Sequence, residues 1–171
     1  MVALCALGVG ITGTLLWKQE NAPLSAATTP SPTPTILSAT APASPSTTQL
    51  ASAQQALAEG NQFYDAGQWA RAIERYQFVI TSGFDNPDVR TDMGNALRFD
   101  GKPQLALEQY KIAQSQDPTH EQSLFNQGGL WAFALHNTTK GVEMWHTYLK
   151  RFPNGHSAKD ARAFIKKYQR K

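Results

Sequence analysis

Residue types recur along this chain at an interval of thirty-four positions, and this interval restricts the fold more than any other feature. Each of two matching stretches opens with a glycine and an asparagine, continues with a second glycine, and ends with an alanine and a tyrosine. A period of about 20–50 residues is typical of arrays in which one supersecondary unit stacks on the next. The matching pairs are Gly60 and Gly94, Asn61 and Asn95, Gly67 and Gly101, Ala72 and Ala106, and Tyr76 and Tyr110.

Each unit has the pattern of two antiparallel helices joined by a turn. Gly67 lies between two helical stretches, and glycine inside a helix costs about 1 kcal/mol relative to alanine, so a break in the helix is indicated here. A left-handed position at the end of a helix suits glycine, which has no Cβ. Gly60 and Ala72, one on each helix, let the two axes approach closely, while Tyr76 fills the space beside them. The pattern therefore predicts a helical hairpin.

A third unit follows the second, with a shift of one residue inside it. Gly128 and Trp131 keep the interval, but Gly141, Trp145 and Tyr148 come one position late. Glycine and proline breaks between the apolar-periodic stretches delimit seven helices. The predicted helices are 52–65, 69–82, 87–99, 103–115, 120–135, 139–151 and 157–169.

These units resemble tetratricopeptide repeats, helical hairpins of 34 residues that stack into arrays. The resemblance implies an all-α fold, a right-handed superhelix of three hairpins at about 53–86, 87–120 and 121–154. A C-terminal capping helix at about 157–169 would cover the apolar edge of the third hairpin. Glu59 and Phe84 depart from the family pattern, which usually has Leu and Pro at these two places. The predicted repeat domain comprises residues 51–171.

The N-terminal part differs sharply in composition. Residues 2–17 are uncharged and almost wholly apolar, which predicts a membrane-anchoring helix within residues 1–20. A cleaved signal segment with a site near Ser25 is the less favoured alternative, and because no Lys or Arg precedes the apolar run, we expect the true start to lie upstream. Residues 21–50, rich in Ala, Ser, Thr and Pro, have too little apolar surface to form a core and are predicted to be a disordered linker.

The sequence offers little for catalysis or metal binding. The single cysteine, Cys5, lies in the apolar segment, and no two of the four histidines are spaced i, i+4. No phosphate-binding glycine loop or nucleophile motif is present, so we expect no enzyme activity, no catalytic residue, no metal site and no cofactor. Residues 150–171 hold eight Lys or Arg and one Asp, but without base-reading aromatic residues no nucleic-acid partner is expected.

The resemblance implies that the first helix of each hairpin contributes to a concave surface that binds a peptide or protein segment. The face shared by i, i+4, i+7 and i+8 runs from three residues before each glycine to five after it. Asn61 and Asn95 could hydrogen-bond an extended backbone. A lysine–asparagine clamp for a terminal carboxylate is not expected, because Leu57 and Thr91 occupy the candidate lysine places. The expected lining residues are Leu57, Asn61, Tyr64 and Asp65, then Thr91, Asp92, Asn95, Arg98 and Phe99, and finally Phe125, Asn126 and Phe133.

Together these features predict a membrane-tethered interaction adaptor of bacterial cell-envelope type. Its partner would be another protein or a peptide segment. The N-terminal helix would anchor the chain in the membrane as a single-pass protein. The globular part is expected outside the cytoplasm. The alternative is a self-assembling structural component of an envelope complex, in which the chain forms homo-oligomers.

Overall fold

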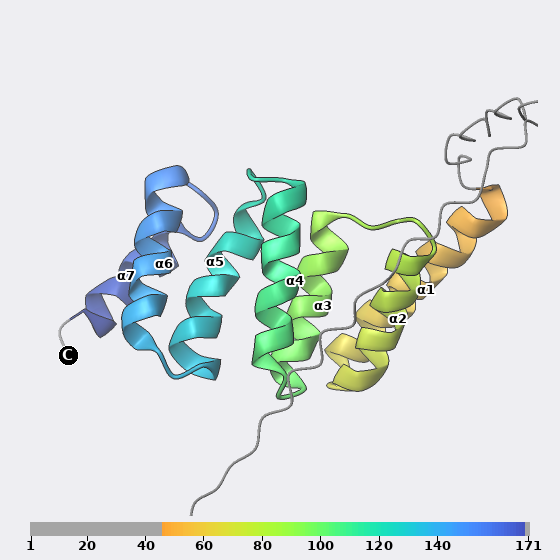
Figure 1. Cartoon of the computed structure of the whole chain (residues 1–171), viewed down its shortest axis with the longest axis horizontal. Helices are drawn as coiled ribbons and strands as arrows, with labels where there is room; N and C mark the ends of the chain where they lie inside the picture. The colour runs from red at the N-terminus through yellow and green to blue at the C-terminus, as the bar shows by residue number, and fades with distance from the viewer. Residues whose placement is uncertain (1–45, 170–171) are drawn as a thin grey trace, which may run out of the picture. The chain divides into compact units, whose positions relative to one another are not determined.

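A computed structural model of the chain describes residues 46–169, and within this range the regular secondary structure is helical throughout (Figure 1). The helices match the predicted number and order, and most ends agree within one residue. They are α1 (Thr47–Asp65), α2 (Trp69–Thr81), α3 (Pro87–Phe99), α4 (Pro103–Gln116), α5 (Glu121–Gly129), the π-helical turn η1 (Leu130–Ala134), α6 (Thr138–Arg151) and α7 (Ala158–Tyr168).

Successive helices pack against each other in chain order, as a repeat array requires. Contacts are densest between α1 and α2, and between α3 and α4, which are the first two hairpins. Gly67 and Gly101 turn these hairpins with φ angles of 70° and 75°, and Gly83 ends α2 with a φ of 90°. The next helix starts where the side chain of Asn86 accepts a hydrogen bond of 3.0 Å from the backbone N–H of Val89.

The third hairpin departs from the predicted continuous helix over 120–135. The α-helix ends at Gly129 and widens into η1, where the N–H of Leu135 donates to the carbonyl of Leu130 over 2.9 Å. A π-turn accommodates one extra residue within a helix. This extra residue explains the one-residue shift in the sequence, and it places His136, with a φ of 52°, where Gly67 and Gly101 stand in the earlier hairpins.

Two hydrophobic cores hold the array together. The first is built from α1 to α4 together with Leu130 of η1, and it includes Tyr76 and Tyr110, whose rings pack onto the glycines of the facing helices. The second joins α5, α6 and α7 around Trp145 and Tyr148. Ala161 and Ile165 of α7 are buried in it, so α7 covers the apolar edge of the third hairpin as predicted for a capping helix.

The first helix begins earlier than predicted. Helix α1 begins at Thr47 rather than 52, and the last residues of the predicted linker therefore belong to it. Ser46 and Gln49 form a capping box, with hydrogen bonds of 3.3 and 2.8 Å, that satisfies the first N–H groups of this long helix.

Both cores and the cap of α1 lie within the described residues 46–169, so a segment from 42 to 171 contains all of them. The predicted anchor at 1–20 and most of the predicted linker at 21–50 lie outside the described residues. Within 46–169, no helix combines the length and apolar character needed to cross a membrane.

Candidate ligand-binding face

The first helices of the three hairpins meet along one surface, which we name the first-helix face and define by α1, α3, α5 and η1. Tyr64 of α1 reaches Phe99 of α3, with ring centroids 6.1 Å apart. Asn126 of α5 donates from Nδ2 to Oδ1 of Asn95 in α3 over 2.9 Å. Side chains from all three hairpins therefore share this surface.

Two asparagines on this face are oriented by tyrosines of the neighbouring helices. The hydroxyl of Tyr76 donates to Oδ1 of Asn61 over 2.9 Å, and the hydroxyl of Tyr110 donates to Oδ1 of Asn95 over 2.7 Å. Because the carbonyl end of each amide is held by a tyrosine, Nδ2 is turned away from it. Among the described residues neither Nδ2 has an acceptor, so both can donate to a ligand.

The third hairpin lacks this arrangement. Gly129 stands where Asn61 and Asn95 stand in the earlier units, and Trp145 replaces the tyrosine. The indole Nε1 of Trp145 is buried without a hydrogen-bond partner in the described part of the chain. The first two hairpins therefore each present an amide that is oriented by a tyrosine, and the described part of the third hairpin does not.

An aromatic cluster lies beside the asparagines. Trp69 at the start of α2 stacks on Phe99 with centroids 4.9 Å apart, and Tyr64 contacts the Trp69 ring edge-on at 5.1 Å. Arg98 lies over the ring of Phe99 at 4.4 Å. The hairpin turn at Gly67 brings Trp69, which opens the second helix of the hairpin, to the first-helix face.

Phe99 and Phe133 leave an exposed apolar surface on this face. They are 47% and 43% exposed, and together with Arg98 and Ala134 they line an open hollow. Since large apolar side chains are usually covered, this hollow is suited to receive an apolar side chain of a ligand.

Three of the predicted lining residues occupy a different environment from the rest. Thr91 is only 2% exposed, and Phe125 packs on Tyr148 and Phe164 in the second core. Leu57 packs against the first core. All three come three residues before a repeat glycine. The prediction that Thr91 lines an open groove is therefore wrong, while Leu57 and Phe125 are only partly buried and remain predicted lining residues.

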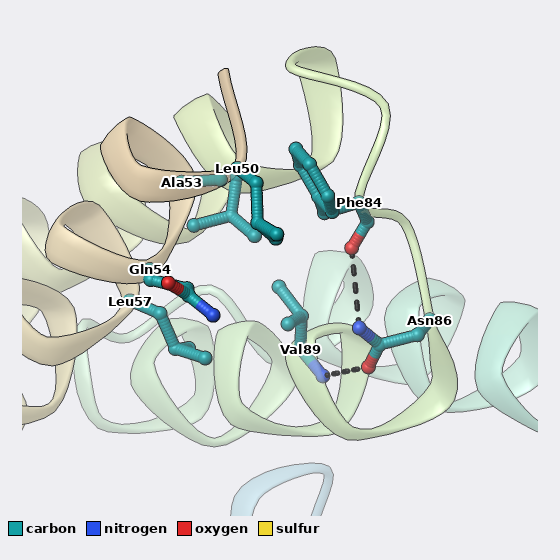
Figure 2. A pocket seen from close by; sticks show the side chains of 8 residues that line it. Leu50, Ala53, Gln54, Leu57, Phe84, Asn86 and Val89 are labelled. Atoms are coloured by element: carbon teal, nitrogen blue, oxygen red, sulfur yellow. Dashed lines mark hydrogen bonds between the residues drawn. The ribbon is translucent and has the colours of Figure 1, made fainter. Parts of the chain in front are cut away.

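Leu57 instead contributes to an apolar pocket at one end of the array (Figure 2). The pocket encloses about 130 Å³ between α1, α2 and the start of α3. Its walls are almost entirely apolar, with Leu50 lying at its exposed side. Leu57 and Val89 line it from the two first helices.

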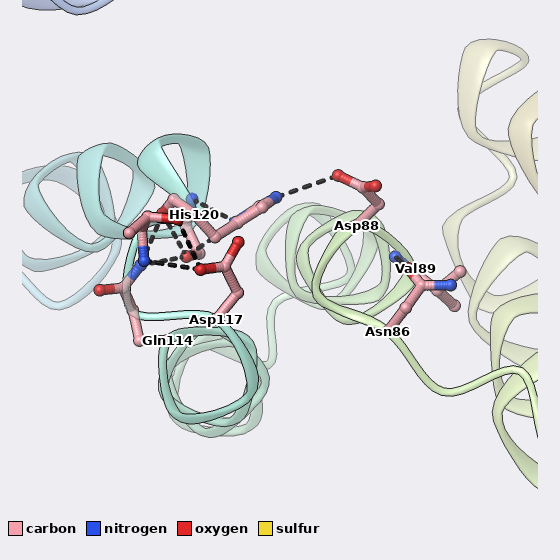
Figure 3. Close-up of polar contacts among 8 residues, drawn as sticks. Asn86, Asp88, Val89, Gln114, Asp117 and His120 are labelled. Carbon is pink, nitrogen blue, oxygen red and sulfur yellow. Dashed lines mark hydrogen bonds and ion pairs between the residues drawn. The ribbon is translucent and has the colours of Figure 1, made fainter.

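A polar contact links α3 and α5 at the edge of the face (Figure 3). Nε2 of His120 lies 3.0 Å from Oδ1 of Asp88, while Nδ1 of His120 accepts from the backbone N–H of Ser123 and so caps α5. His120 thus has a structural explanation. Among residues 46–169, no three His, Cys, Asp or Glu side chains are grouped to hold a metal ion.

Asp92 is the unusual charge on this face. It lies one helical turn before Asn95, and it is half-buried with no ion pair or hydrogen-bond partner among the described residues. Burial, assisted by the nearby carboxylate of Asp88, raises the pKa of Asp92 to about 6, and His120 opposes this rise. Burial likewise raises the pKa of Tyr64, on which Arg98, Asp92 and Asp65 also act.

Replacing Asp92 by asparagine should stabilise the domain near neutral pH. Because the pKa of Asp92 is higher in the folded than in the unfolded chain, the folded state loses stability as pH rises from about 4 to 6. We expect Asp92→Asn to raise the free energy of unfolding by about 1–2 kcal/mol at pH 7, allowing for partial solvent exposure, and by almost nothing at pH 4. Urea unfolding at both pH values measures this, with Asp65→Asn as a matched exposed control. An equal gain at both pH values would contradict the assignment.

Comparison with known proteins identifies the fold. No protein-family model and no curated protein sequence matches the chain. Among solved structures, the TPR domain of Arabidopsis OM64 is 18% identical, with a TM-score of 0.61, over 70% of this chain and 98% of that one. The TPR2B domain of yeast Sti1, in its complex with pHsp70, is 17% identical over the same shares, with a TM-score of 0.63.

The second TPR domain of human RPAP3, in complex with the HSP70 peptide SGPTIEEVD, is 21% identical. The match covers 72% of this chain and 98% of that chain, with a TM-score of 0.59. The described part of the chain therefore has the fold of a tetratricopeptide-repeat domain.

Proposed function

We propose that this chain is a membrane-tethered adaptor whose repeat domain binds an extended segment of another protein along the first-helix face. This face would form the concave side of a right-handed superhelix, and the domain would have no chemistry of its own. Two of the structural neighbours are complexes with Hsp70 or an HSP70 peptide, which supports binding of a peptide by this fold.

The oriented pair of asparagines carries the proposal most strongly. An extended peptide backbone presents carbonyl oxygens on alternate residues, and the free Nδ2 donors of Asn61 and Asn95 suit such acceptors. Beside them, the hollow between Phe99 and Phe133 suits one apolar side chain. Donors for the backbone and a hollow for a side chain are the two elements of sequence-tolerant peptide recognition.

Selection from a library of random linear peptides on the immobilised segment 42–171 tests this proposal. The recovered peptide should bind the double variant Asn61→Ala/Asn95→Ala about tenfold more weakly, because two hydrogen bonds of about 0.5–1.5 kcal/mol each are lost. The control is Gln77→Ala, an exposed residue of the second helix α2, which should leave the affinity unchanged.

Equal binding by the double variant and the wild type would count against the first-helix face. Failure to recover any peptide, together with self-association in sedimentation experiments, would favour the alternative of a self-assembling structural component.

The membrane tether and the location outside the cytoplasm rest on residues 1–50 and are part of the proposal. The apolar run at 2–17 supports the tether, and the uncharged, proline-rich stretch after it would hold the repeat domain away from the bilayer. Protease treatment of spheroplasts carrying the full chain tests the orientation. Digestion of the repeat domain is expected, and complete protection in sealed spheroplasts would contradict it.

A further inference from the structure

The first-helix face carries more acidic than basic groups, and Asp92 lies among the acidic ones. Asp65 of α1 and both Asp88 and Asp92 of α3 contribute negative charge, while Arg98 and His120 are the basic groups near them. His120 pairs with Asp88, and Arg98 lies over the ring of Phe99. Asp92 is the acid of this group that is half-buried and has no partner in the described residues.

Asp92 also lies at the centre of the proposed recognition elements. It is on the same side of α3 as Asn95, one turn away, because i and i+3 share a face. Phe99, seven residues further along α3 and on the same side, contacts Tyr64 of α1, so this side of α3 adjoins the part of α1 that bears Asn61. A peptide backbone bound by the two asparagines would therefore pass the carboxylate.

A half-buried carboxylate without a partner is costly in the free domain, and a cation that arrives with a ligand removes this cost. Hydrogen bonds between charged groups are stronger than neutral ones and gain further in a partly desolvated site. An acidic ligand would meet the opposite situation, since a second carboxylate would be brought towards Asp92 and Asp88.

We propose that the bound segment carries a lysine or arginine whose side chain pairs with Asp92, so that the face selects a cationic segment. This inference rests on the proposed function and adds the chemical class of the partner. The backbone is held by Asn61 and Asn95, the apolar hollow takes a neighbouring side chain, and Asp92 sets the charge that is accepted.

The same library of random linear peptides tests this, selected in parallel on wild-type segment 42–171 and on the variants Asp92→Asn and Asp65→Asn. Lysine or arginine should be enriched at one fixed position on the wild type and on Asp65→Asn, and this enrichment should disappear on Asp92→Asn. The wild-type consensus peptide should bind Asp92→Asn about tenfold more weakly and Asp65→Asn within about twofold. Replacing the peptide's cation by glutamine should weaken binding to the wild type but not to Asp92→Asn.

The outcomes separate this inference from the proposed function. Recovery of peptides that depend on Asn61 and Asn95 but show no cationic position, or an acidic one, overturns the inference and leaves the function standing. A cationic position that is equally enriched on Asp92→Asn also overturns it. Recovery of no peptide at all overturns both. Because Asp92→Asn is expected to be more stable than the wild type, lost binding cannot be attributed to unfolding, and thermal denaturation of each variant checks this.

Discussion

Replacing Trp145 by alanine is expected to lower the free energy of unfolding by about 3–5 kcal/mol, the range for large aromatic residues in cores. Trp145 is fully buried, stacks on Phe164 of α7 at 4.7 Å and lies 6.0 Å from the ring of Phe133. Its removal would take away packing contacts that α6 makes with α5 and with the capping helix α7. Since the indole Nε1 has no partner in the described residues, the loss would come from packing alone. Urea unfolding of segment 42–171 measures it.

A matched control for this prediction is Phe78→Ala. Phe78 is also an aromatic residue on a second helix, but it is 46% exposed, and we expect a loss of about 0.5–1 kcal/mol. A domain of this size has about 5–15 kcal/mol of stability, so Trp145→Ala could leave much of the chain unfolded. Trp145→Phe, which removes fewer atoms, should then give an intermediate loss. Similar losses of unfolding free energy for Trp145→Ala and Phe78→Ala would contradict the assignment of Trp145 to the second core.

Replacing Gly94 by alanine should destabilise the domain, although alanine is the better helix former by about 1 kcal/mol. A Cβ at this position would lie 2.5 Å from Cε1 and 2.8 Å from Cδ1 of Tyr110, which is fully buried. The ring cannot move without breaking its hydrogen bond to Asn95. Overpacking of a core costs about 1–3 kcal/mol, and we expect a net loss in this range in urea unfolding.

Gly129→Ala is the matched control and should change stability in the opposite direction. The nearest atoms to a Cβ there belong to Arg98 and Phe133, at 3.7 and 3.9 Å, which is ordinary contact. We expect a gain of about 0.5–1 kcal/mol from helix propensity. If both substitutions stabilised the domain, the close approach of α3 and α4 would be contradicted.

The repeat positions were predictable because each has a direct physical role that a single residue type reveals. Gly67 and Gly101 occupy left-handed turns, and Gly94 lies against Tyr110, as the thirty-four-residue interval indicates. From these positions the helix order, the hairpins and the capping role of the last helix follow. The shift in the third unit was visible in the sequence, but its location was not, since a π-turn at Leu130–Ala134 has no residue signature of its own.

The candidate site was predictable only in part. Helical periodicity placed Asn61, Asn95 and Phe99 on one side, but it could not say how much of that side the second helix covers. Thr91 was therefore assigned to an open groove and is buried, while Phe125 is partly buried against Tyr148. The tyrosines that orient the asparagines are fifteen residues away along the chain, and only the packing of the hairpin brings them together.

Mapping the amide chemical shifts of segment 42–171 by NMR, while adding the peptide recovered by selection, tests the central claim most directly. The largest changes are expected on α1, α3 and α5, around Asn61, Asn95 and Phe99. Changes confined to the outer surfaces of α2 and α4, around the exposed Phe78 and Leu105, would contradict a binding site on the first-helix face.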